Sequence, residues 1–107
     1  MGLEIEVRDE GDRRIIAVRG EVDLNSSPEL RKAVLGAVEG VARVGVDLSG
    51  ATYMDSSGVA TLVEGLKSAS ENDRSFVLIR PSNAVMRVLE LARLDSFFDI
   101  RDGLEAG

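Results

Sequence analysis

The sequence predicts an α/β domain with a mixed sheet of about five strands, mostly parallel after an N-terminal antiparallel hairpin, and covered by helices. Two observations lead to this fold class. Stretches with the apolar pattern of strands alternate along the chain with stretches whose apolar residues recur at helical spacing. Strands joined through helices pair in parallel by right-handed crossovers, which place the helices over the sheet. A chain of 107 residues has the size of one domain, so we expect residues 1–107 to fold together.

The N-terminal hairpin is predicted from two strand patterns separated by a turn. Leu3, Ile5 and Val7 alternate with charged residues, as in a half-buried strand at the edge of a sheet. Gly11-Asp12 supplies the turn. Residues 14–19 (RIIAVR) are expected to form the second strand and to pair back on the first.

Three helices are predicted from their caps and apolar stripes. In the first, we expect Ser27 at the N-cap, Pro28 at the first helical position and Gly40 at the end. Its stripe is Leu30, Val34, Ala37, Val38 and Val41. The second is expected to begin at Val59, with the stripe Val59, Leu62, Val63 and Leu66. The third is capped by Ser82 and carries Val85, Val88, Leu89 and Ala92.

Three further strands separate and follow these helices. Residues 44–48 (VGVDL) and 76–79 (FVLI) are short apolar runs, as expected for strands that are covered on both faces. Residues 97–100 (FFDI) are expected to form the last strand. The resulting element order is β-β-α-β-α-β-α-β.

Two loops that are rich in polar groups follow neighbouring strands. The segment GEVDLNSS (20–27) comes after the second strand, and SGATYMDSSG (49–58) comes after the third. In open α/β sheets, functional groups gather in the loops beyond the carboxyl ends of the strands. We therefore expect Asp23 to lie beside the run Asp55-Ser56-Ser57 at one end of the sheet.

The run Asp55-Ser56-Ser57 stands directly before a helix and admits three interpretations. Asp and Ser are preferred helix caps, but a cap needs only one such residue, and here three precede Gly58. A catalytic serine would need a base to take its proton, and the chain contains no histidine. Alternatively, one of the serines is the target of chemistry done by another protein.

Other chemistries find little support in the sequence. A Ser-Lys arrangement would have to recruit Lys32 or Lys67, both expected on exposed helix positions, and no phosphate-binding P-loop is present. Asp23, Asp47 and Asp55 could hold a metal on paper, but loop carboxylates are common. Cysteine is absent, which removes disulfides and thiolate chemistry. We therefore expect no catalytic residue, metal or cofactor.

Charge and hydropathy restrict the partners and the compartment. The net charge is −6 and the isoelectric point is near 4.6, so nucleic-acid binding has no electrostatic basis. The N-terminus lacks the apolar stretch of a signal peptide. No apolar run approaches the roughly 20 residues that a membrane-spanning helix needs. We expect a cytoplasmic protein that does not insert into membranes.

Several motifs resemble one known family over nearly the whole chain. They are GEVD (20–23), VDLS (46–49) leading to YMDSSG (53–58), and SNAVMRVL (82–89) with Leu94 and Phe97-Phe98. With these motifs the chain resembles the STAS-domain anti-sigma factor antagonists, small bacterial proteins of the sporulation and general stress partner-switching systems. The resemblance implies a single STAS-type domain with three or four helices. The family usually continues into a further C-terminal helix, whereas this sequence has RDGLEAG after Ile100.

The resemblance also implies a function and a site. Such proteins are not enzymes: the unphosphorylated form binds an anti-sigma factor that is also a serine kinase and thereby releases the sigma factor. The kinase phosphorylates the serine that follows the motif aspartate, which is Ser56 here, and a serine phosphatase restores the hydroxyl. The implied partner-binding residues are Asp23, Asp55, Ser56, Ser57 and Gly58.

Two alternatives within the same fold remain at this stage. STAS-type chains also occur as cytoplasmic accessory subunits of lipid or anion transporters, where association with the transporter ATPase would not depend on phosphorylation of Ser56. Others are components of stressosome-type scaffolds, but those chains usually carry an additional N-terminal sensory domain. Neighbouring genes for an anti-sigma kinase or for a transporter would distinguish the first two possibilities.

Overall fold

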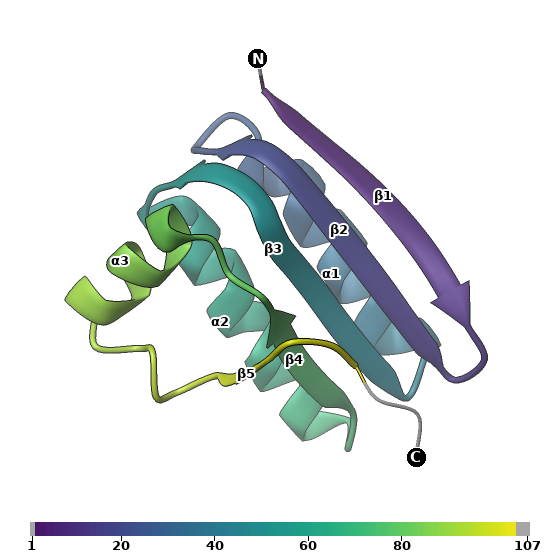
Figure 1. Ribbon diagram of the computed structural model, residues 1–107. Helices are drawn as coiled ribbons and strands as arrows, with labels where there is room; N and C mark the ends of the chain where they lie inside the picture. The colour runs from purple at the N-terminus through teal and green to yellow at the C-terminus, as the bar shows by residue number, and fades with distance from the viewer. Residues whose placement is uncertain (1, 105–107) are drawn as a thin grey trace.

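The computed structural model describes residues 2–104 as a five-stranded sheet covered by helices (Figure 1). The strands are β1 (Leu3–Glu10), β2 (Arg13–Val22), β3 (Arg43–Met54), β4 (Ser75–Ile79) and β5 (Asp99–Arg101). The helices are α1 (Ser27–Gly40), α2 (Ser56–Glu71) and α3 (Asn83–Leu91). The sheet order is β1-β2-β3-β4-β5, with β1 antiparallel to β2 and all other pairs parallel. The predicted fold class and element order are confirmed.

Strands β2 and β3 both continue beyond their predicted ends. The segments GEV (20–22) and SGATYM (49–54), predicted as loops, belong to the strands, because parallel pairing continues from Gly20 with Ala51 to Val22 with Met54. Irregularities in the register allow this continuation past residues that usually interrupt strands. Gly20 adopts a φ of 99°, and a side chain there would collide with the backbone carbonyl of Gly2, the residue before β1. As a result, β2 and β3 end together.

Two predicted helix starts were wrong, by one residue for α1 and by three residues for α2. The N-cap of α1 is Ser26, and Ser27 is instead the first helical residue, with its side chain buried. Helix α2 begins at Ser56, three residues before the predicted start at Val59, because Asp55 caps it. The predicted cap of α3 is confirmed, since the Ser82 hydroxyl accepts a hydrogen bond of 3.2 Å from the Val85 amide.

The last strand is shorter and later than predicted. Phe97 and Phe98 lie in the turn before β5, where their rings stack edge to face with centroids 5.4 Å apart. Pairing with β4 starts only at Asp99, so the aromatic pair was mistaken for strand because of its β-propensity. Phe98 is buried in the core. No helix follows β5 up to residue 104, and the remainder of the predicted C-terminal region, 105–107, lies outside the described residues.

The core lies between the sheet and the helices α1 and α2, which cover the same face (Figure 1). Its fully buried side chains include Ile16 of β2, Val34 of α1 and Leu62 of α2. The predicted stripe of α2 points inward, although Val63 and Leu66 are only partly buried. A small second cluster of Ile15, Val77, Ile79 and Leu104 lies apart from this core. The core therefore fixes α1 and α2 relative to the strand ends from which they start.

Candidate functional site

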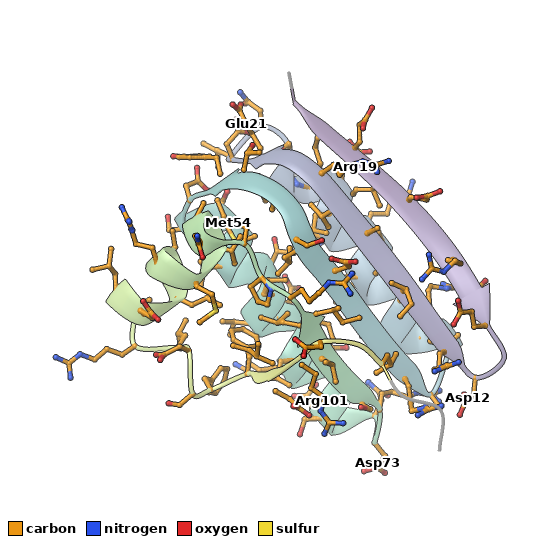
Figure 2. The ribbon with its side chains drawn as sticks, in the orientation of Figure 1. Asp12, Arg19, Glu21, Met54, Asp73 and Arg101 are labelled. Atoms are coloured by element: carbon orange, nitrogen blue, oxygen red, sulfur yellow. The ribbon has the colours of Figure 1, made fainter. Side chains whose placement is uncertain are left out.

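The carboxyl ends of β2 and β3 bring the two predicted loops together. Val22 pairs with Met54 at the last position of the ladder, and the Asp55 amide donates a hydrogen bond of 3.1 Å to the Val22 carbonyl. Figure 2 shows Glu21 and Met54 at one end of the molecule and Asp12 and Asp73 at the other. The expected juxtaposition of the two loops is confirmed.

Asp55 is the N-cap of α2 and holds the start of that helix. Its Oδ1 accepts hydrogen bonds from the Ser57 amide at 2.9 Å and from the Ser57 hydroxyl at 2.6 Å. The pKa of Asp55 is lowered, and the hydrogen bond from the Ser57 hydroxyl is the largest cause. Burial raises the pKa by less than that, and the amides of Ser57, Gly58 and Leu24 each lower it further. Asp55 is therefore a carboxylate at neutral pH, joined to both loops.

The two serines occupy different environments although they are adjacent. Ser57 is partly buried, and its hydroxyl donates a hydrogen bond to Asp55. Ser56 is the first residue of α2 and is exposed, and its hydroxyl has no hydrogen-bond partner within residues 2–104. It also lies at the amino end of a helix, where the backbone dipoles favour negative charge. Ser56 is thus the accessible hydroxyl of this site.

Gly58 lies beneath the serines and not on the surface. A Cβ atom there would lie 2.7 Å from Cγ of Met54 and 2.8 Å from Cγ1 of Val22, and the residue is buried. The glycine therefore lets α2 start close against the ends of β2 and β3. The role that this geometry gives to Gly58 is to relieve crowding between α2 and the strand ends. Any contribution of Gly58 to partner binding is therefore indirect.

Asp23 closes the neighbouring turn between β2 and α1. Its Oδ1 accepts hydrogen bonds from the amides of Asn25 and Ser26, each at 3.0 Å, and from the Ser26 hydroxyl at 3.1 Å. Such a side-chain-to-backbone pattern is typical of aspartate in turns. The residue is partly buried, and its predicted contact with a partner stays a prediction.

Leu24 is a feature of the site that the sequence analysis did not single out. Its side chain is 75% exposed at the tip of the turn that Asp23 closes. The only signal in the sequence is one apolar residue among polar ones in a predicted loop. That signal is weak, because single exposed leucines are frequent on protein surfaces.

The described residues offer no place for a metal. No group of three or more acidic side chains within residues 2–104 is arranged to hold an ion. Asp47 lies within β3, where its carboxylate pairs with Arg80 at 3.0 Å and accepts a hydrogen bond of 2.7 Å from the Ser49 hydroxyl, and it forms no such group with Asp23 and Asp55. Within the same residues, no helix combines the length and the apolar character that a membrane crossing requires.

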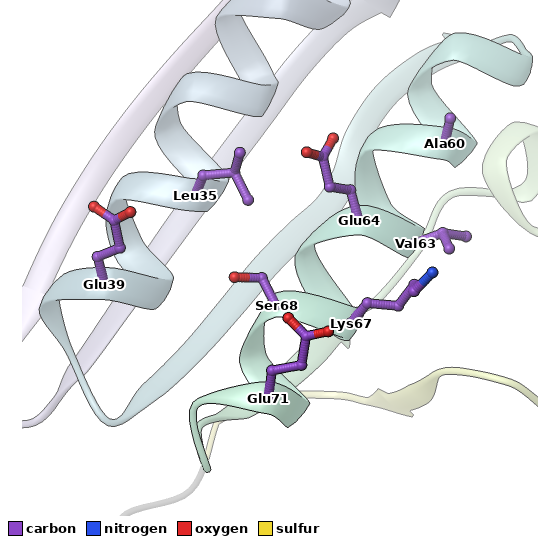
Figure 3. A pocket seen from close by; sticks show the side chains of 8 residues that line it. All are labelled: Leu35, Glu39, Ala60, Val63, Glu64, Lys67, Ser68 and Glu71. Carbon is purple, nitrogen blue, oxygen red and sulfur yellow. The ribbon is translucent and has the colours of Figure 1, made fainter.

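A groove of about 600 Å³ lies between α1 and α2 (Figure 3). It is lined by Leu35, Glu39, Ala60, Val63, Glu64, Lys67, Ser68 and Glu71. None of these belongs to the Asp23 and Ser56 loops. The groove is therefore a separate surface feature and supplies no group to the site.

Comparison with known proteins shows the family to which this α/β domain belongs. A family model described as "Mlab, STAS domain" matches residues 5–102. An anti-sigma-B factor antagonist of Staphylococcus epidermidis is 30% identical over 106 residues, which are 98% of each chain. The chain belongs to the family of STAS-domain anti-sigma factor antagonists.

Solved structures show the same fold at lower sequence identity. The crystal structure of an anti-sigma factor antagonist from Mycobacterium paratuberculosis has a TM-score of 0.85 and 23% identity, and the match covers 96% of this chain and 88% of that one. The phosphorylated form of the Bacillus cell fate determinant SpoIIAA has a TM-score of 0.72 and 18% identity, with 91% and 90% covered. The similarity to these structures concerns the fold.

Replacing Gly58 by Ala should destabilise the protein, although alanine is the better helix former by about 1 kcal/mol. The added methyl group would overlap Met54 and Val22, and we expect a loss of about 1–3 kcal/mol in the free energy of unfolding. Gly36 of α1 is the matched control, because nothing lies within 4 Å of its missing Cβ. Gly36→Ala should raise stability in the same urea titration. Stabilisation by both substitutions would show that Gly58 is not crowded.

Replacing Asp55 by Asn should remove a pH-dependent part of the stability. Because the folded pKa of Asp55 lies below the ordinary 3.8, its carboxylate stabilises the fold above that pH and loses this effect as the pH falls through the lowered value. The wild type should therefore be more stable than Asp55→Asn at neutral pH, and the difference should shrink in acid. Urea titrations between about pH 7 and pH 2.5 measure it. A difference that is independent of pH would contradict the role of the charged cap.

Proposed function

We propose that this chain is an anti-sigma factor antagonist that is switched by phosphorylation of Ser56. In its unphosphorylated form it binds an anti-sigma factor with serine kinase activity, so that the sigma factor is released. The observation that carries this proposal is the contrast between the serines: the Ser56 hydroxyl is exposed and unpartnered among the described residues, whereas that of Ser57 is held by Asp55. The name of the Staphylococcus relative supports the same function.

The site can carry a phosphate without loss of its own fold. A phosphoserine adds a charge of about −1.5 to −2 at neutral pH. At the first residue of α2 this charge would interact favourably with the amino end of the helix. The cap is made by Asp55 and Ser57, so modification of Ser56 breaks no hydrogen bond of the helix start. The added charge would therefore be felt mainly by the partner.

Phosphorylation of Ser56 changes the charge of the site by an amount that is large for a small domain. Asp55 is already ionised next to Ser56, and the chain has a net charge of −6. A partner surface that fits a neutral hydroxyl beside one carboxylate would meet a dianion after phosphorylation. Like charges brought together in this way cost binding energy, which accounts for dissociation.

In this proposal the chain acts in the cytoplasm as a ligand and as a substrate, and not as an enzyme. Its partners are the anti-sigma serine kinase and a serine phosphatase that restores the hydroxyl. The surface of this chain that contacts its partners comprises Asp23, Asp55, Ser56 and Ser57, and Gly58 supports it from below. Stable association with a transporter ATPase that is insensitive to Ser56 would instead support the accessory-subunit alternative.

Ser56, and not Ser57, should be the residue that the kinase modifies. After incubation with candidate anti-sigma kinases and ATP, mass spectrometry of the peptide that contains residues 55–58 should place the phosphate on Ser56. Ser56→Ala should resist phosphorylation and still bind the kinase, because the cap remains. Ser57→Ala is the matched control and should still be phosphorylated. Phosphate mapped to Ser57 in the wild type would contradict the assignment.

Ser56→Asp should keep the fold and bind the kinase more weakly. One carboxylate carries less charge and fewer acceptor oxygens than a phosphate, so it should reproduce the modified state only in part. We expect a loss of affinity of about tenfold or more, equivalent to about 1.4 kcal/mol or more. Calorimetric titration of the kinase measures it. Equal affinity of the phosphorylated and unmodified proteins would overturn the proposed switch.

A further inference from the structure

We infer that Leu24 is an apolar anchor for the protein that recognises Ser56, and that this partner presents an apolar pocket beside the place where it receives the serine. The inference rests on the proposed function and adds to it a determinant of affinity that does not depend on charge. It follows from the exposure of Leu24, from the rigidity of its turn and from the connection of that turn to Asp55.

Exposure alone does not distinguish Leu24, because isolated apolar side chains are normal on a surface. The large apolar side chains exposed within residues 2–104 are Val7, Leu24, Tyr53, Leu91 and Phe97. Leu24 is 75% exposed, and it lies in the turn that packs beside the Ser56 loop. Tyr53, at the end of β3 beside Glu21, lies near the same site, but it is only 49% exposed and belongs to a strand, whereas Leu24 stands on the turn between Asp23 and Ser26.

The turn around Leu24 is held on both sides. Before it, the Asp23 amide donates to the Ser26 hydroxyl oxygen at 3.0 Å, and that hydroxyl is also 2.9 Å from the Glu21 carbonyl. After it, the amides of Asn25 and Ser26 donate to Asp23. A side chain presented by an ordered backbone loses less conformational freedom on binding than one on a loose loop. Leu24 is therefore preorganised for contact.

The same turn is joined to the start of α2. The Leu24 amide is among the groups that lower the pKa of Asp55, and the Asp55 amide donates to the carbonyl of Val22. The Asp55 amide, next to Ser56 in the chain, is thus hydrogen-bonded to the Val22 carbonyl, two residues before Leu24. A partner that contacts the Ser56 hydroxyl would also cover the tip of this turn.

Leu24 and Ser56 would then have separate tasks. An apolar contact surrounded by polar groups is the usual anatomy of a protein interface. Burial of Leu24 would contribute affinity, whereas the phosphate on Ser56 would decide whether that affinity is expressed. Because Leu24 does not take part in the transfer of phosphate, it should affect the KM of the kinase for this substrate and leave kcat nearly unchanged.

The test compares two leucines of similar exposure. Leu24→Ala and Leu91→Ala, the latter at the end of α3 with 80% exposure, are titrated with each purified anti-sigma serine kinase of the organism that makes this chain. Leu24→Ala should weaken binding about tenfold, equivalent to about 1.4 kcal/mol, and should raise KM by a similar factor. Leu91→Ala should bind within about twofold of the wild type, or about 0.4 kcal/mol.

Further variants and controls separate the possible failures. Leu24→Met, which keeps an apolar side chain of similar volume, should retain most of the affinity. Both alanine variants should unfold at the temperature of the wild type, because both side chains are exposed. Normal binding by Leu24→Ala, or equal losses for Leu24→Ala and Leu91→Ala, would overturn the anchor while the proposed function stands. Failure of the wild type to bind any of these kinases would overturn the proposed function itself.

Discussion

The carboxylate of Asp55 is the interaction on which the functional end of this molecule depends. It accepts hydrogen bonds from the amide and the hydroxyl of Ser57. The Leu24 amide also lowers the pKa of this carboxylate. One side chain therefore caps α2 and links it to the turn after β2. Because the cap uses Ser57, the residue between them is left exposed at the first position of the helix. The accessibility of Ser56 is a consequence of how its neighbours are bonded.

The strand ends make this arrangement possible. β2 and β3 finish together at Val22 and Met54, so the turns that follow them start from the same level of the sheet. Gly58 allows α2 to begin directly against these two residues, since any side chain there would overlap both. The buried base of the site is thus well packed, and its polar surface is carried on rigid elements. Such a surface suits recognition by another protein, and a charge added to it changes that recognition without rearranging the base.

The sequence allowed the order of the elements and the meeting of the two loops to be predicted, because both follow from apolar periodicity and from the geometry of parallel strands. It did not allow the strand ends to be placed, since Gly20 and Gly50 usually interrupt strands and the register irregularities that accommodate them are set by tertiary pairing. Nor could it decide whether Asp55 or Ser57 caps α2, because both residue types are good caps. The distinction between the serines depends on the hydrogen bond from the Ser57 hydroxyl to Asp55, which no sequence pattern shows.

Leu24 illustrates a different limit of sequence patterns. An apolar residue in a predicted loop is equally compatible with a buried side chain and with an exposed one. In the structure Leu24 is exposed, and the hydrogen bonds of Asp23 and Ser26 hold its turn in place. The Phe97-Phe98 pair shows the converse case. Two adjacent aromatic residues are typical of a strand, whereas in the structure the two rings pack edge to face against each other in the turn before β5.

The central claim is that phosphorylation of Ser56 alters the surface and leaves the Asp55 cap in place. Amide hydrogen exchange of Ser57 and Gly58, measured by NMR in the unmodified and in the Ser56-phosphorylated protein, tests this most directly. Both amides are hydrogen-bonded to Asp55, one to its side chain and one to its carbonyl, and their protection should be the same in the two forms. Loss of protection on phosphorylation would show that the switch works by opening the start of α2, which contradicts the claim.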